Sequence, residues 1–210
     1  MKTYKFKFRG KELSRTQVKN NILAVLNEAN EETFKNGAEW YTIANEIAQK
    51  VRVASDTEIN LAQAVGVIAA LSPLKSWSQN IKLATEFINE GKRSGHTGVM
   101  VKKASDILDL IDPTTDEIVE ILKGQKITNF FLNIYYPNKD VAVTIDRHAI
   151  GIALIGTKKI KQEETDGQIT KLQFEFLVHC YKWAAAELNL SAVQLQAITW
   201  EHFRANKVKR

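Results

Sequence analysis

Apolar residues recur at helical spacing along almost the whole chain, and turn signals divide them into short segments. Ser14 and Gln17 form a capping-box pattern, and Val18, Ile22 and Val25 then line one helical face. Further helices are expected at 39–51, from Asp56 or Thr57 to the Ser72-Pro73 stop, and at 76–89, 101–111, 114–122, 125–135, 146–154, 169–188 and 191–205. Such helices bury their apolar stripes only by packing on one another, so the pattern predicts an all-α fold.

Two regions depart from this pattern. Residues 4–8 alternate apolar and basic side chains, which predicts one short β element at the N-terminus. The Gly-rich, basic segment 91–98 predicts a loop between two helical lobes of a single domain. We expect one lobe to contain residues 1–98 with the C-terminal helices within 169–207, and the other to contain residues 99–156.

The composition excludes several classes of protein. The single cysteine, Cys180, excludes an internal disulfide framework and a four-cysteine zinc or iron–sulfur site. The four histidines are scattered, so we expect neither a metal nor a cofactor. No apolar run approaches the ~18–20 residues of a membrane helix, and no secretory signal is visible. These features favour a monomer in a reducing intracellular compartment, without a membrane partner.

Charge is concentrated at the two ends of the chain. The net charge is +5 overall, with +5 in residues 1–15, +3 in residues 201–210 and −3 in the remainder. Basic ends on a nearly neutral body predict phosphate contact from the termini, although basic tails also serve solubility alone.

The segment 120–154 carries the most specific motif. A short helix runs into a turn ending at Gly124, Lys126 follows in the first turn of a new helix, and Asp146 starts another helix twenty positions later. This arrangement resembles the helix–hairpin–helix DNA glycosylase superfamily, which contains endonuclease III and 8-oxoguanine glycosylase, in a divergent form without an iron–sulfur cluster. Leu122 stands at the position of the hairpin's first glycine.

A second segment agrees with this resemblance. Residues 68–73 and 76–84 are similar to the helix–turn–helix that lines the base pocket in that superfamily, and the match covers about residues 60–156. The resemblance implies DNA contacts from the hairpin residues Leu122, Lys123, Gly124, Gln125 and Thr128. It also implies a base pocket or wedge formed by Ser72, Trp77, Gln79, Asn80 and His148.

The chemistry of base excision gives two residues defined roles. Cleavage of an N-glycosidic bond builds positive charge on the sugar, which the Asp146 carboxylate would stabilise. A neutral lysine amine, which partial burial favours, can attack the anomeric carbon and form a Schiff base, and Lys126 is the candidate. The substrate would be a nucleotide flipped out of duplex DNA, or single-stranded DNA.

Other interpretations of these residues stay open. Lys126 is also typical of a solvated surface charge, Asp146 of a helix N-cap and His148 of a structural hydrogen-bonding residue. Trp40, Tyr41 and Trp200 lie on apolar stripes typical of a core. The alternative functions are a nucleobase-modification enzyme of the kind associated with viral DNA hypermodification, a catalytically inactive DNA-binding module, and a helical interaction protein with no role on nucleic acid.

Overall fold

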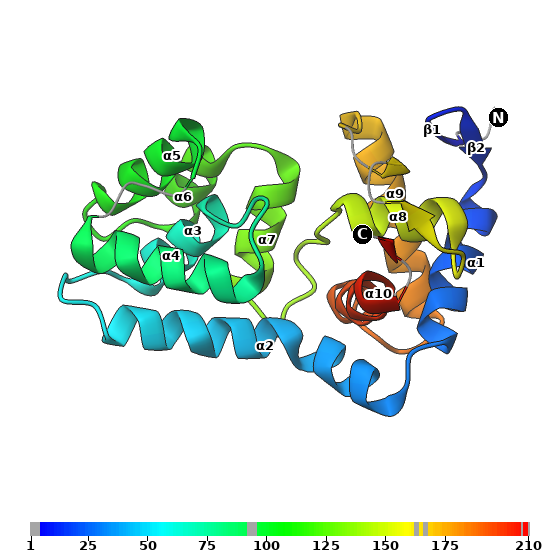
Figure 1. Cartoon of the computed structure of the whole chain (residues 1–210), viewed down its shortest axis with the longest axis horizontal. Helices are drawn as coiled ribbons and strands as arrows, with labels where there is room; N and C mark the ends of the chain where they lie inside the picture. The colour runs from blue at the N-terminus through cyan, green and yellow to red at the C-terminus, as the bar shows by residue number, and fades with distance from the viewer. Residues whose placement is uncertain (1–4, 92–95, 162–163, 166–167, 207, 210) are drawn as a thin grey trace. The chain divides into compact units, whose positions relative to one another are not determined.

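The computed structural model describes residues 5–91, 96–161, 164–165, 168–206 and 208–209. Helices dominate this part of the chain and the strands are short, so the all-α prediction with a small N-terminal β element is confirmed. The chain divides into two compact units, one formed by Met1–Trp40 with Val143–Arg210 and the other by Tyr41–Ala142 (Figure 1). Within the described ranges, no helix has the length and apolarity needed to cross a membrane.

The first unit joins the two ends of the chain in one core. Helix α1 packs against α8, α9 and α10, and residues such as Ile22, Leu177 and Phe203 are fully buried where they meet. The elements of this unit are β1 (Phe6–Phe8), β2 (Lys11–Leu13), α1 (Arg15–Asn27), α8 (Arg147–Ile155), β3 (Ile160–Lys161), α9 (Lys171–Ala186), α10 (Ala192–Asn206) and β4 (Val208–Lys209). Strands β3 and β4 pair in parallel.

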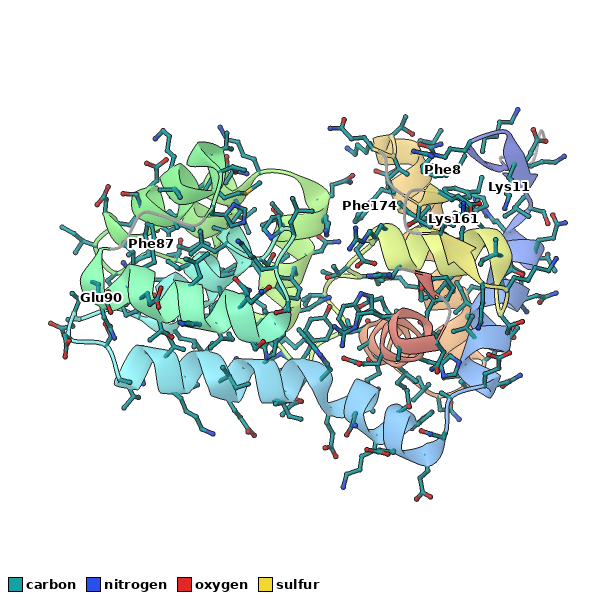
Figure 2. The ribbon with its side chains drawn as sticks, viewed as in Figure 1. Phe8, Lys11, Phe87, Glu90, Lys161 and Phe174 are labelled. Carbon is teal, nitrogen blue, oxygen red and sulfur yellow. The ribbon has the colours of Figure 1, made fainter. Side chains whose placement is uncertain are left out.

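Strands β1 and β2 form an antiparallel hairpin in which Phe6 faces Leu13 and Phe8 faces Lys11. Arg9 and Gly10 make the connection with φ angles of 45° and 78°, the left-handed geometry that suits the twist of a two-residue hairpin turn. Phe6 and Phe8 are buried, and the ring of Phe6 stacks on Phe176 of α9 at 6.0 Å. Figure 2 labels Phe8 and Lys11 on these paired strands.

The second unit is built around α3. This helix is apolar on every side, every residue from Ala62 to Ala70 is buried, and it packs against α4, α5, α6 and α7 (Figure 1). The elements are the C-terminal part of α2 (Glu31–Val53), α3 (Leu61–Ala70), α4 (Trp77–Glu90), α5 (Gly98–Leu108), α6 (Thr115–Leu122) and α7 (Gln125–Tyr135). On α4, Phe87 is buried and Glu90 is exposed (Figure 2).

Several helix boundaries differ from those expected. Helix α3 begins after Asn60 and not at Asp56 or Thr57, because Asn60 and Gln63 form a reciprocal capping box. The Asn60 amide also donates to the side chain of Asp112, a contact across 52 positions that local sequence does not reveal. Helix α2 begins at Glu31, eight residues earlier than expected. The prediction missed its first turns because they are polar and carry little apolar periodicity.

The two units also differ from the two lobes that the sequence suggested. Helix α4 packs on α3, which also packs on α5, α6 and α7, whereas α8 packs on α1. These contacts join segments that are distant in the chain, so no local pattern indicates them. Two predicted features fall partly outside the described residues: the strand expected at 4–8 includes Tyr4, and the loop expected at 91–98 includes residues 92–95.

Candidate functional site

Asp146 is held by three hydrogen bonds in the first unit. It is the N-cap of α8, and its Oδ1 accepts from the backbone N–H groups of His148 and Ala149 at 2.9 Å each. Its Oδ2 accepts from the indole Nε1 of Trp200, on α10, at 2.9 Å. The prediction that Asp146 caps a helix is confirmed. Since both carboxylate oxygens are fixed, the orientation of the group is set by two different helices.

The Trp200 ring that binds this carboxylate contacts further rings. The Trp200 ring meets Trp40 edge to face at 6.0 Å and His148 at 5.9 Å, and the Arg204 guanidinium lies 4.5 Å from its centroid. His148 is buried, whereas Trp40 and Trp200 are half-buried. The arrangement combines an oriented negative charge with partly accessible aromatic surface.

The charge of Asp146 acts on the buried hydroxyl of Tyr181. Tyr181, on α9, is fully buried, and its burial raises the pKa of the phenol above its ordinary value, an effect that the Asp146 charge reinforces and the neighbouring Thr199 hydroxyl opposes. Thr199 itself donates to the carbonyl of Leu195 at 2.8 Å. The phenol therefore stays protonated and adds no second negative charge beside Asp146.

The hairpin between α6 and α7 belongs to the second unit. Lys123 and Gly124 have φ angles of 44° and 88°, which reverse the chain within two residues. Leu122 is fully buried, backbone included, so it presents no surface for the DNA contact that the resemblance implies. Lys103 of α5 donates from Nζ to the carbonyl oxygens of Leu122 and Lys123. Burial, and then the charge of Lys123, lowers the pKa of Lys103.

Lys126 is exposed in the first turn of α7. Phe130 lies one turn further along the same face, because residues four apart are neighbours on a helix. The Phe130 ring meets Trp77 of α4 at 6.4 Å and Tyr41 of α2 at 6.3 Å, both edge to face. Phe130 thus lies one helical turn from Lys126 and in ring contact with Trp77. Gln125 is exposed and Thr128 is half-buried on the same helix.

The other expected pocket residues of this unit are engaged locally. The Ser72 hydroxyl donates to the Ala69 carbonyl, and Gln79 completes a capping box with Ser76. Asn80 is 2% exposed, and its side-chain amide donates to the Ile68 carbonyl at 3.0 Å. These contacts fix the turn between α3 and α4.

The expected site residues are therefore divided between the two units. Asp146 and His148 lie in the first unit, and the hairpin, Lys126 and Trp77 lie in the second. Sequence reasoning missed Trp200, Phe130 and Lys103. Each contacts its partner through tertiary packing, and the spacing of Phe130 four residues after Lys126 was the one local signal. Among the described residues, no group of three or more His, Cys, Asp or Glu side chains could hold a metal ion.

A family model matches residues 6–207, nearly the whole chain. The chain belongs to the DUF7178 family. That family is described as one of unknown function. No curated protein and no solved structure matches this DUF7178 member. The arrangements around Asp146 and Lys126 are therefore the basis for assigning it a role.

Proposed function

We propose that this DUF7178 protein is a DNA glycosylase that excises a flipped-out damaged or modified base, with an associated lyase step through Lys126. The observation that carries the proposal is the Asp146 carboxylate, which is fixed through both oxygens by Trp200 and by the amides that start α8. The resemblance of segment 120–154 to helix–hairpin–helix glycosylases supports the same assignment.

An oriented carboxylate suits this reaction. As the glycosidic bond breaks, its electron pair leaves with the base and positive charge develops on the sugar, which a fixed negative charge stabilises without reorganisation. A carboxylate offers about four acceptor positions, and the described residues fill three of those of Asp146, which leaves one for a substrate in this proposal.

Lys126 suits the lyase step. Its amine attacks the anomeric carbon as the base departs with the bonding electrons, and the attached nitrogen then loses a proton. The C1′–O4′ bond opens with its electron pair and a proton going to the ring oxygen, which leaves a Schiff base between Lys126 and C1′. Loss of a C2′ proton from this Schiff base expels the 3′ phosphate. The amine is exposed, whereas partial burial was expected for this role, and it is therefore reachable by a bound nucleotide. The half-buried Trp77 beside Phe130 offers a ring on which a base can stack, which is worth roughly 1–3 kcal/mol.

Borohydride trapping tests these roles directly. The protein is incubated with a panel of duplexes carrying lesions, modified bases or an abasic site, and covalent complexes and released bases are measured. We expect Lys126→Ala to abolish trapping and Lys50→Ala, which removes another exposed lysine of the second unit, to leave it intact. We expect Asp146→Asn to slow base release by about 10²–10³-fold.

Two results would contradict the assignment. Trapping that persists in Lys126→Ala would show that Lys126 is not the nucleophile. Full base release by Asp146→Asn would show that the Asp146 charge does not stabilise the sugar. Trp200→Phe serves as a control for disturbed packing, because it keeps the carboxylate and removes one of its donors.

A catalytically inactive DNA-binding module is the second candidate. It is favoured by the exposure of Lys126 on the described surface and by the buried Leu122 at a position where the superfamily carries a glycine. Salt-dependent DNA binding without trapping or base release on the whole panel would support this candidate over the enzyme.

A further inference from the structure

The exposed surface of the β1–β2 hairpin concentrates positive charge. Residues 5–12 contain four basic side chains and one carboxylate, a net charge of +3 on eight residues. All five charged residues are exposed: Lys5, Lys7, Arg9, Lys11 and Glu12. This charge density is far higher than that of the chain as a whole.

These charges stand on an anchored element. Phe6 and Phe8 alternate with the basic residues and point into the core of the first unit, and the hairpin is further tied to α9 by the Gln173 amide, which donates to the Lys7 carbonyl. The basic side chains are therefore carried on a strand of fixed position and not on a flexible tail.

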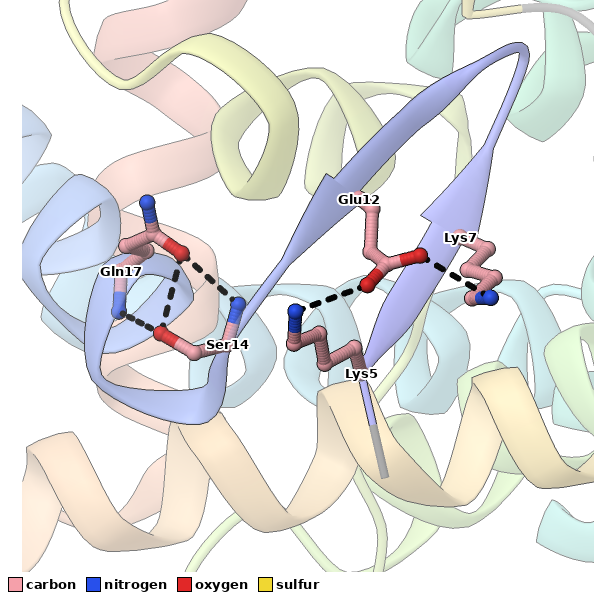
Figure 3. A network of polar contacts seen from close by, with 5 residues as sticks. All are labelled: Lys5, Lys7, Glu12, Ser14 and Gln17. Atoms are coloured by element: carbon pink, nitrogen blue, oxygen red, sulfur yellow. Dashed lines mark hydrogen bonds and ion pairs between the residues drawn. The ribbon is translucent and has the colours of Figure 1, made fainter. Parts of the chain in front are cut away.

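Glu12 gathers two of the lysines around it. Its Oε1 lies 2.8 Å from Nζ of Lys5 and its Oε2 lies 2.9 Å from Nζ of Lys7 (Figure 3). Hydrogen bonds from Lys5 and then Lys7 lower the pKa of Glu12 to about 2, so it stays ionised at neutral pH. One carboxylate cancels one of the two lysine charges, and Arg9 adds a further positive charge at the turn. Lys11 pairs with Phe8 across the hairpin and therefore stands on the opposite face from Lys5, Lys7 and Glu12.

We propose that this face of the hairpin binds the phosphate backbone of DNA without reading its sequence. The identity of the partner rests on the proposed function, and the surface itself rests on charge complementarity with a regularly charged polyanion. An anionic membrane is a poorer match, because the large apolar residues of the hairpin point into the core and leave none to insert between lipids.

Fluorescence anisotropy with a labelled, undamaged duplex tests the surface independently of catalysis. We expect Lys5→Gln combined with Lys7→Gln to weaken binding and to reduce the slope of log K against log salt by about 2, one unit for each lost phosphate contact. We expect Glu12→Gln to do the opposite and tighten binding, because it removes the only carboxylate of the hairpin. The matched control replaces Lys158 and Lys159, two exposed lysines of the same unit, with Gln.

The lysine variant is expected to weaken DNA binding and Glu12→Gln to tighten it, and this difference separates DNA contact from loss of structure. Loss of the Glu12 ion pairs can only loosen the hairpin, so a structural effect would weaken binding in both variants. Wild-type affinity and slope in the Lys5/Lys7 variant, an equal loss in the Lys158/Lys159 control, or binding to anionic vesicles in preference to duplex would each overturn the proposal. Base release that the hairpin variants leave unchanged, together with unchanged DNA affinity, would overturn the proposed role of the hairpin and leave the proposed function standing. Hairpin-dependent binding without trapping would overturn the proposed function alone.

Discussion

At the scale of single residues, Asp146 combines a structural role with a chemical one. Its Oδ1 closes the start of α8, while its Oδ2 ties that helix to Trp200. The sequence predicted the first role, because Asp before a helix is a strong N-cap signal. It placed Trp200 on a core stripe, since nothing within either local segment links residues 54 positions apart.

Replacing Asp146 with Asn distinguishes the roles of its two carboxylate oxygens. The amide oxygen of Asn can still accept from the α8 backbone, but its NH2 group then faces the Nε1–H of Trp200, and two donors cannot pair. We expect Asp146→Asn to lower the free energy of unfolding by about 1–3 kcal/mol, measured by urea denaturation.

A double-mutant cycle identifies the cause of that loss. Adding Trp200→Phe removes the opposed donor, so the double variant should recover part of the lost stability. Effects that simply add, within about 0.5 kcal/mol, would mean that the Asp146–Trp200 hydrogen bond carries no coupling energy.

At the scale of elements, the α6–α7 hairpin depends on a helix that is not part of it. Lys103 of α5 donates to the last carbonyls of α6, where a helix end leaves acceptors unsatisfied. The left-handed Lys123 and Gly124 then turn the chain into α7. The sequence indicated the turn through Gly124 but gave no sign of the donor.

We expect Lys103→Met to loosen the hairpin while leaving α5 folded. The apolar replacement keeps much of the packing of the lysine stem and removes the donor, so hydrogen exchange of the amides from Lys123 to Thr128 should quicken. Lys102→Met is the matched control, because Lys102 is exposed and pairs with Asp106 on its own helix. Unchanged exchange in Lys103→Met, or equal acceleration in both variants, would contradict the role of Lys103.

At the scale of the whole molecule, the first unit is assembled from both ends of the chain. Within it, the first part of α2 packs closely on α10, where Gly37 lies against the backbone of Ile198. A Cβ at Gly37 would overlap the Ile198 Cα and lie 2.8 Å from its backbone nitrogen. A side chain there has no room unless the two helices separate.

We therefore expect Gly37→Ala to lower the free energy of unfolding by about 1–3 kcal/mol through overpacking, despite the higher helix propensity of alanine. Gly98→Ala provides the contrast, because open space surrounds Gly98 and the same substitution at the start of α5 should be neutral or stabilising. Thermal or urea unfolding measures both. Equal effects at the two glycines would show that the contact between α2 and α10 is not tightly packed.

The sequence by itself determined most of the helices, because apolar periodicity, capping residues and breakers are local properties of a segment. Ser14 with Gln17, the Ser72-Pro73 stop and the Asp146 cap are examples, and each lies where the local pattern placed it. Tertiary structure alone decided which helices share a core, that Phe130 packs on Trp77, and that Trp200 and Lys103 hold Asp146 and the hairpin. Those contacts join residues that are remote in the chain, and a contact between two faces leaves no pattern in either segment taken alone.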